Sequence, residues 1–96
     1  MLGNPEPHLP YYNRASVYFN TGKYAAAIAD YDEALRLHPQ FAPAYLSRGW
    51  TYYQMGDVPT AIADYERYLA IKPDDEAVRD ALRQMRAGTN QADATS

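Results

Sequence analysis

The pentapeptide AIADY occurs twice in this chain of 96 residues, at positions 27–31 and again at 61–65. The two copies are 34 residues apart, and the match extends well beyond them when the chain is aligned with itself at that offset. Between residues 8–41 and 42–75, 11 of the 34 aligned positions are identical, with no gap. A fixed period of this length predicts stacked structural repeats, and it limits the possible folds more than any local pattern.

Each half of the repeated unit has the periodicity of an α-helix. Apolar residues fall at helical spacing on one face of each half, and the second unit repeats the arrangement of the first. In the first unit these residues are Tyr11, Ala15, Tyr18 and Phe19, followed by Ala27, Ile28, Tyr31, Ala34 and Leu35. The sequence therefore predicts an all-α fold in which each unit is a pair of helices.

Glycine and proline mark the predicted ends of these helices. Gly22 and Gly56 follow the first helix of each unit, where glycine accepts the left-handed backbone conformation. Pro39 and Pro73 end the second helices, because proline cannot continue an α-helix. Two further prolines, Pro43 and Pro59, fall in the first turn of a helix, where the missing N–H costs no hydrogen bond. Asp57 is the predicted N-cap of the helix that contains Pro59.

A fifth helix is predicted directly after the second unit. Asp74, Asp75 and Glu76 suit a helix N-terminus, and capping explains these carboxylates better than a metal site does. Val78, Ala81, Leu82 and Met85 follow as a one-sided apolar stripe. The predicted division is a flexible leader over 1–7, unit one over 8–41, unit two over 42–75, a capping helix over 76–87 and a disordered tail over 88–96.

Composition argues against several classes of function. The net charge of −3 does not provide the lysine and arginine excess that nucleic-acid binding needs. The sequence has no cysteine, so it forms no disulfide or thiolate metal site. No apolar run reaches the roughly 18 residues of a membrane span, and the first ten residues lack a signal-peptide core. By default we expect a cytoplasmic protein.

No catalytic grouping is evident either. His8 is assigned to the loose leader and His38 to a helix C-terminus, where a partly cationic ring favours the helix dipole. Asp30, Asp32 and Glu33 are predicted to lie on a solvated outer face. Hence we expect no enzyme activity, no metal and no cofactor.

The spacing resembles the tetratricopeptide repeat (TPR) family, whose 34-residue pattern runs W-x2-L-G-x2-Y, then A-x3-F, then P. The matching residues are Tyr11, Ala15, Tyr18, Ala27, Tyr31 and Pro39 in unit one and Tyr45, Gly49, Tyr52, Ala61, Tyr65 and Pro73 in unit two. Three features depart from the pattern. Arg14 and Arg48 replace its leucine and are expected to put charge at a unit edge. Tyr68 stands where unit one has Ala34, which fits a last unit that meets a cap. Two repeats are also fewer than the usual three.

The resemblance implies a right-handed superhelical α-solenoid of antiparallel helix pairs, five helices in all, whose first helices line a concave groove. Such grooves bind peptides or proteins. In this chain the groove stripe is expected to be aromatic and almost uncharged, and it consists of Tyr12, Ser16, Phe19, Leu46, Trp50 and Tyr53. Members of the family that hold the C-terminal carboxylates of heat-shock chaperones use Lys, Asn and Arg along the groove. This stripe carries no Lys or Arg, so that activity is not inferred.

Two other interpretations stay open. Trp50 and Tyr53 could fill the interface between repeats, although Trp50 has only Ser16 as its counterpart. The chain could also self-associate as a homodimer or a larger assembly, through the groove or through an apolar edge formed by Leu9, Tyr12 and Val17. Binding to a protein or peptide partner remains the main expectation.

The repeated AIADY is interpreted as a packing unit and not as an active site. Its first alanine marks the close approach of two helices, and its tyrosine fills the seam between them. Its aspartate is expected to face water, so that replacing Asp64 with alanine would change the stability little.

Overall fold

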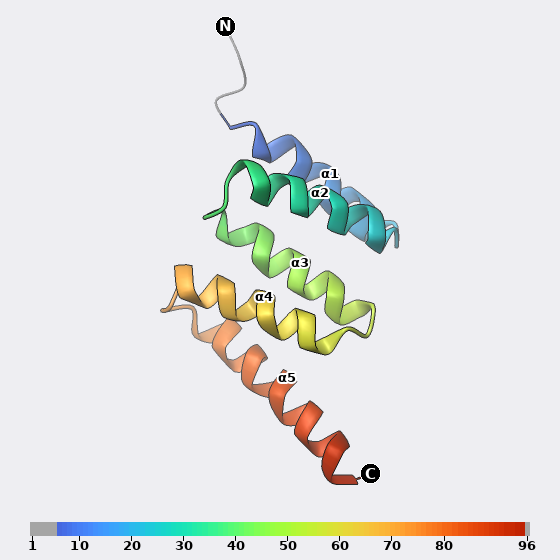
Figure 1. The fold of residues 1–96 in the computed structure, drawn as a ribbon, viewed down its shortest axis with the longest axis vertical. Helices are drawn as coiled ribbons and strands as arrows, with labels where there is room; N and C mark the ends of the chain where they lie inside the picture. The colour runs from blue at the N-terminus through green and yellow to red at the C-terminus, as the bar shows by residue number, and fades with distance from the viewer. Residues whose placement is uncertain (1–5, 96) are drawn as a thin grey trace, which may run out of the picture.

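The computed structural model describes the backbone of residues 6–95 and the side chains of residues 6–88. Within residues 6–95 the chain forms five α-helices and no strand. They are α1 (His8–Asn20), α2 (Tyr24–Leu37), α3 (Ala42–Gln54), α4 (Val58–Ile71) and α5 (Glu76–Thr95). Each helix packs antiparallel against the next one in the chain, and Figure 1 shows the resulting single stack. The predicted all-α fold of paired helices is confirmed.

The connections follow the predicted turn chemistry. Gly22 and Gly56 have φ angles of +79° and +88°, so each occupies the left-handed region that favours glycine. Pro43 and Pro59 lie in the first turns of α3 and α4. The Asp57 carboxylate caps α4 by accepting a hydrogen bond from the backbone N–H of Thr60. Short, well-defined turns of this kind keep the two helices of each unit antiparallel.

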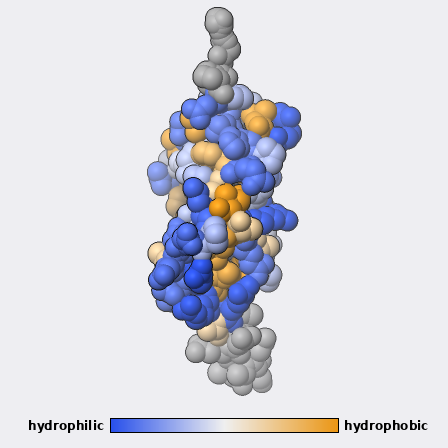
Figure 2. All heavy atoms as spheres, turned by 90° about the vertical axis from the view of Figure 1, so that its left-hand side faces the viewer, coloured by the Kyte–Doolittle hydropathy of each residue, from blue (hydrophilic) through white to orange (hydrophobic). Residues whose placement is uncertain are grey.

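The core consists of two clusters, one between unit one and the start of α3 and the other between α4 and α5. The first contains Ala15, Ala27, Tyr31, Leu35 and Ala44, and the second contains Ala61, Tyr65, Val78, Leu82 and Met85. The tyrosine of each AIADY copy is buried in its cluster, as the repeat predicts. Figure 2 shows hydrophobic atoms gathered along the middle of one side of the stack, with hydrophilic atoms on both flanks. This pattern is what repeats need when each buries its apolar stripe against its neighbours.

α3 and α4 approach each other closely at Gly49. A Cβ atom added to this residue would lie only 2.7 Å from Cδ1 of Tyr65 and 3.1 Å from Cβ of Asp64. The Tyr65 ring is buried and belongs to the second cluster, so it has little room to withdraw. Only glycine lets α3 approach α4 this closely, which explains the small residue at this place in the repeat.

A repeated ion pair joins the two helices of each unit. Nε and Nη2 of Arg14 donate to the two carboxylate oxygens of Asp30 at 2.7 and 2.8 Å. Nε and Nη2 of Arg48 donate in the same way to Asp64 at 2.9 and 2.7 Å. In addition, Nη1 of Arg48 donates to Oδ1 of Asp32 at 2.7 Å. Arg48 therefore links its own unit to unit one.

Two sequence expectations about charge are therefore wrong. Asp30 and Asp64 do not face water: both are buried, and the side chain of Asp64 is only 1% exposed. Arg48 is not a charge at a unit edge, since its side chain is 14% exposed and lies between helices. A buried carboxylate is tolerated only with a charged partner and satisfied hydrogen bonds, and the arginines provide both.

α5 begins as expected and extends further. The side chain of Asp75 accepts a hydrogen bond from the backbone N–H of Val78 and thus caps the helix. Tyr68 donates its hydroxyl to the same carboxylate at 2.6 Å, and this bond holds the pKa of Asp75 below its usual range. The capping helix was predicted to end at residue 87, and α5 continues as a helix to Thr95 (Figure 1). No proline interrupts this part of the helix.

At its other end the chain also departs from expectation. His8 begins α1 and is buried, and its ring packs edge-on against His38 and Phe41 with centroids 4.5 Å apart in both contacts. It therefore does not belong to a loose leader, but fixes the start of α1 against the connection between α2 and α3. Most of the proposed leader, residues 1–5, lies outside the described residues.

The two buried aspartates predict different mutational costs. Asp64→Ala removes a carboxylate whose partner Arg48 is largely buried, so we expect a loss of about 2–3 kcal/mol in the free energy of unfolding. Asp30→Ala frees Arg14, whose side chain is 58% exposed and can be rehydrated, so we expect a loss of about 1 kcal/mol. Urea denaturation of both variants measures the difference. Equal losses would contradict the role assigned to the burial of Arg48.

The close approach at Gly49 gives a second prediction. Gly49→Ala should destabilise the chain by about 1–3 kcal/mol through overpacking against Tyr65. Gly88→Ala is the matched control, because a Cβ there meets no atom within 4 Å. In this open part of α5 the substitution should be neutral or should stabilise by up to about 1 kcal/mol. Thermal unfolding of the two variants checks the sign of each effect.

Candidate functional site

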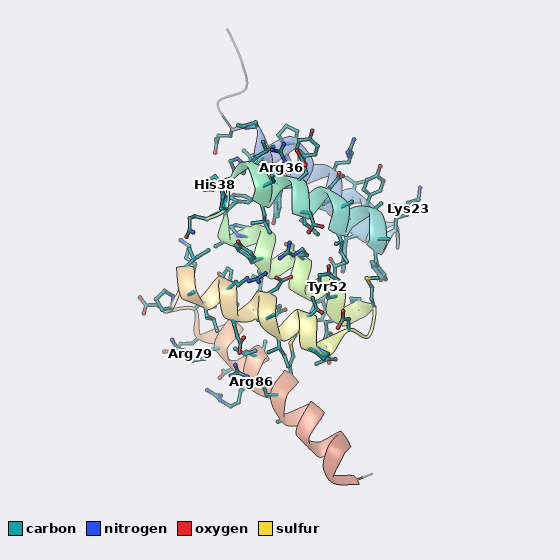
Figure 3. The ribbon with its side chains drawn as sticks, in the orientation of Figure 1. Lys23, Arg36, His38, Tyr52, Arg79 and Arg86 are labelled. Carbon is teal, nitrogen blue, oxygen red and sulfur yellow. The ribbon has the colours of Figure 1, made fainter. Side chains whose placement is uncertain are left out.

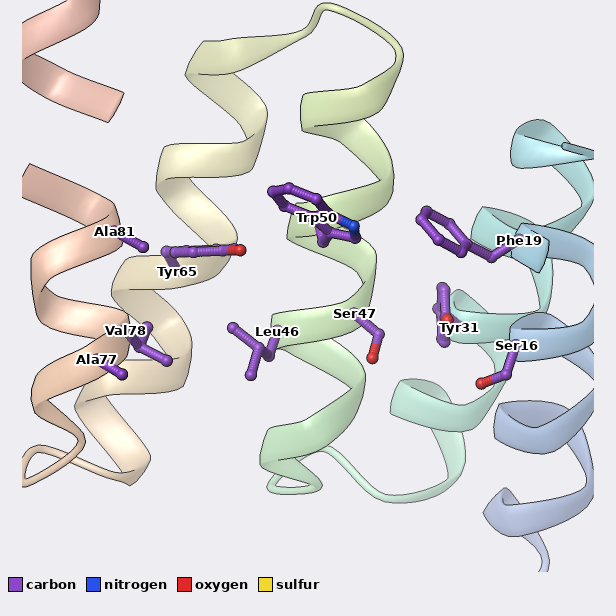
Figure 4. Close-up of a pocket in the computed structure, with 10 residues that line it drawn as sticks. All are labelled: Ser16, Phe19, Tyr31, Leu46, Ser47, Trp50, Tyr65, Ala77, Val78 and Ala81. Carbon is purple, nitrogen blue, oxygen red and sulfur yellow. The ribbon is translucent and has the colours of Figure 1, made fainter. Parts of the chain in front are cut away.

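A cavity of about 440 Å³ opens between the two units and the capping helix. Its wall comes from all five helices, as the close-up in Figure 4 shows. The lining residues are Ser16 and Phe19 from α1, Tyr31 from α2, Leu46, Ser47 and Trp50 from α3, Tyr65 from α4, and Ala77, Val78 and Ala81 from α5. No described residue in this wall carries a formal charge. The site is thus an apolar recess with a few hydroxyl groups.

Trp50 is the most prominent side chain of the wall. In Figure 4 it lies between Phe19 on one side and Tyr65 on the other. It remains 43% exposed, and its ring is stacked on Tyr53 with centroids 5.5 Å apart and planes 17° from parallel. Tyr53 is itself exposed and, together with Gln84, borders a smaller recess next to the cavity. The two stacked rings thus form an aromatic surface that no described residue covers completely.

Four of the six groove residues expected from the sequence meet in this wall: Ser16, Phe19, Leu46 and Trp50. Tyr53 borders the neighbouring recess instead. Tyr12 does not line the cavity. Its ring packs against Tyr31 and Phe41, and its hydroxyl lies 3.3 Å from Oγ of Ser47. Tyr12 is therefore used to hold unit one against α3, and it is only partly exposed.

The floor of the cavity was missed by the sequence analysis. Tyr31 and Tyr65 were assigned to the seams, yet their ring edges also reach the cavity. The signal was available: the repeat pattern has phenylalanine here, and tyrosine adds a polar tip suited to a partly wet surface. Ala77 and Ala81 of α5 form the remaining wall, and their spacing of four places them on one helical face. Small residues there leave the space that a larger side chain would fill.

The tyrosines of the floor remain neutral near pH 7. Burial raises the pKa of the Tyr31 phenol above its ordinary value, and hydrogen bonds with Ser16 and Ser47 oppose that rise only in part. Burial likewise raises the pKa of Tyr65. The cavity therefore presents aromatic faces and neutral hydroxyls to anything that enters it, and it offers no charge to an ionic ligand.

The basic side chains lie elsewhere on the molecule. Figure 3 shows Arg79 and Arg86 on α5 and Lys23 at the start of α2, none of which lines the cavity. Arg86 donates to Glu66 and so ties the capping helix to α4. Within the described residues, no three histidine, cysteine or acidic side chains are grouped so that they could hold a metal ion. No helix over this range is both long and apolar enough to cross a membrane.

Comparisons with known proteins agree with this architecture. The family model described as tetratricopeptide repeat matches residues 12–76. The first TPR of Spaghetti (RPAP3), solved bound to the HSP90 peptide SRMEEVD, is 30% identical with a TM-score of 0.82, over 91% of this chain and 69% of that one. Two crystal structures of MamA are each 29% identical, with TM-scores of 0.83 and 0.84. They match 91% and 90% of this chain, which spans 48% and 50% of theirs. No curated protein matches the chain.

The exposure of Trp50 can be tested directly, since it is the only tryptophan in the sequence. In the free protein we expect its fluorescence to be quenched by acrylamide, because almost half of the side chain is in contact with water. The emission maximum should also lie to the red of that of a buried indole. A monomer whose tryptophan is completely shielded from the quencher would mean that Trp50 fills the repeat interface, and it would remove the open wall described above.

Proposed function

This chain belongs to the tetratricopeptide repeat family, and we propose that it is a non-catalytic module that binds a segment of a partner protein in the cavity between its two repeats and α5. The observation that carries this proposal is the aromatic wall around Trp50. A tryptophan that remains 43% exposed beside an apolar recess leaves apolar surface in water that a bound segment would cover.

The difference between the two repeats supports the same proposal. At the 34-residue offset the counterpart of Trp50 is Ser16, so the large ring is not part of the repeated packing pattern. Ser16 faces the cavity from the opposite side and leaves it open. A large side chain on one wall and a small one on the other together form a recess wide enough for one apolar side chain of a partner.

The chemistry of the wall also favours one class of segment. The RPAP3 TPR was solved with an acidic peptide, SRMEEVD. The wall of the present cavity has neutral hydroxyl groups and no lysine or arginine among its lining residues. A segment held by an apolar or aromatic side chain therefore fits this site better than one held by its carboxylates.

Peptide selection tests this function without a known partner. A displayed library of random peptides is selected on the immobilised chain, and the enriched peptides are then measured against variants. Trp50→Ala should weaken binding about 30-fold, as expected when an aromatic anchor is lost. Ser16→Trp should also abolish binding, because it fills the recess from the other wall. The matched control is Met55→Ala, which removes an apolar side chain that is exposed but does not line the cavity.

The same measurements separate partner binding from self-association. Light scattering over a range of concentrations gives the molar mass of the free chain. We expect a monomer whose cavity is available to the selected peptides. If the free chain forms a stable dimer and Trp50→Ala dissociates it, the occupant of the cavity is a second copy of the chain and not a segment of another protein. Peptides that bind wild type, Trp50→Ala and Ser16→Trp equally would contradict the site.

A further inference from the structure

The first helices α1 and α3 and the capping helix α5 carry an equivalent face, related by the 34-residue repeat. In α3 this face is Ala44, Arg48 and Thr51, and in α5 it is Val78, Leu82 and Met85. Both sets are buried or nearly so. The first packs on α2, since Ala44 shares a cluster with Leu35 and Arg48 binds Asp32, and the second packs on α4 in the cluster of Tyr65. A preceding helix therefore covers this face in α3 and α5.

In α1 the equivalent face is open. It consists of Pro10, Arg14 and Val17, which we call the α1 outer face. Pro10 is exposed, the side chain of Arg14 is 58% exposed, and Val17 is 60% exposed. Thr51, the counterpart of Val17, is completely buried. The face that packs against a helix elsewhere in the chain is thus presented to solvent here.

Among the described residues, Nη1 of Arg14 lacks the carboxylate partner that the equivalent atom of Arg48 has. Arg14 and Arg48 use Nε and Nη2 identically, to bind the aspartate of their own unit. Nη1 of Arg48 then binds Asp32 of α2, whereas Nη1 of Arg14 makes no hydrogen bond or ion pair with any described residue. The guanidinium of Arg14 also lies over the rings of Tyr11 and Tyr18, at 5.8 and 5.9 Å from their centroids. Its orientation is therefore fixed before anything binds.

We propose that the α1 outer face binds a helix of a partner protein that presents a carboxylate to Nη1 of Arg14, as α2 presents Asp32 to Arg48. This inference does not depend on the proposed function of the cavity, because Pro10, Arg14 and Val17 do not line it. It rests on the continuity of the repeat and on the charge complementarity already present between α2 and α3.

A second copy of this chain is a poorer occupant for two reasons. Two α1 outer faces packed about a twofold axis would bring one Arg14 close to the other, and like charges repel. The helix of a second copy that could provide a carboxylate at the right place is α4, through Glu66. That residue is already held by Arg86, and the adjoining face of α4 is covered by α5. Compared with a second copy, a helix of a different protein is therefore the better occupant.

The chain contains its own probe for this interaction. A peptide with the sequence of residues 24–37, acetylated and amidated at its ends, reproduces the helix that covers the equivalent face of α3. We expect its addition to isotopically labelled full-length chain to shift the NMR signals of Pro10, Arg14 and Val17. Signals around Trp50 should not move, and the Trp50→Ala chain should bind this peptide normally.

Matched peptides test the carboxylate. Replacing Asp32 with asparagine in the peptide should weaken binding about fivefold, since it removes one charged partner at a half-exposed site. Replacing Asp30 with asparagine is the control, because in the chain that carboxylate points to the other neighbour of α2. On the receptor, Val17→Glu should abolish binding without unfolding the chain, since the side chain at this position is largely in water.

Four results would overturn the proposal. The peptide could fail to bind at millimolar concentration, or it could shift the signals around Trp50 and not those of α1. Equal losses from the two asparagine peptides would exclude the carboxylate as the determinant. A dimer of the free chain that Val17→Glu dissociates would assign the face to a second copy instead. The two tests are independent, because Trp50→Ala should weaken binding of the selected cavity peptides and leave binding of the α2 peptide unchanged.

Discussion

The guanidinium group of Arg48 holds unit two to unit one by charged hydrogen bonds, in addition to the apolar contacts between α2 and α3. It donates two hydrogen bonds to Asp64 in its own unit and a third to Asp32 in the preceding one. Apolar seams between helices tolerate sliding, whereas a planar group with three fixed donors holds the neighbouring helices at one register. The cavity has walls from both units, so its width is set by this register. The shape of the site therefore depends on this ion pair.

The two repeats are most alike where they pack and least alike where they face the cavity. Tyr31 and Tyr65 do the same structural work in their clusters, and so do Ala27 and Ala61. By contrast, Ser16 and Trp50 line the recess from α1 and α3 with side chains of very different size, although the repeat makes them equivalent. A structure of perfect repeats would have either two serines and a wide shallow groove or two tryptophans and a blocked one. The difference between the units is what produces a binding recess of useful size.

Much of this architecture could be predicted from the sequence because it depends on periodicity. The 34-residue offset, the glycines at the turns and the prolines in first helical turns each have a local physical cause, and all agree with the structure. The buried aspartates could not be predicted from hydropathy, which assigns every carboxylate to solvent. Their partners stand 16 residues earlier in the chain, on another helix. The one sequence signal for their burial is that an arginine and an aspartate recur together, as Arg14 with Asp30 and as Arg48 with Asp64. The tyrosine floor was missed for a related reason, since one side chain can fill a seam and also reach a surface.

The division of the core has a consequence for how the chain unfolds. The two clusters share no residue, and α3 is the helix that contacts both, so each cluster can be regarded as a separate element coupled to the other through α3. Elements coupled in this way open from their weakest end, and among the described helices that is α5, which packs on α4 alone, whereas α1 contacts both α2 and α3. A segment lodged in the cavity touches Tyr31 of one cluster and Tyr65 of the other. Occupancy would thus add a coupling term between the two elements, and the chain would change from stepwise opening toward all-or-none behaviour when its partner is bound.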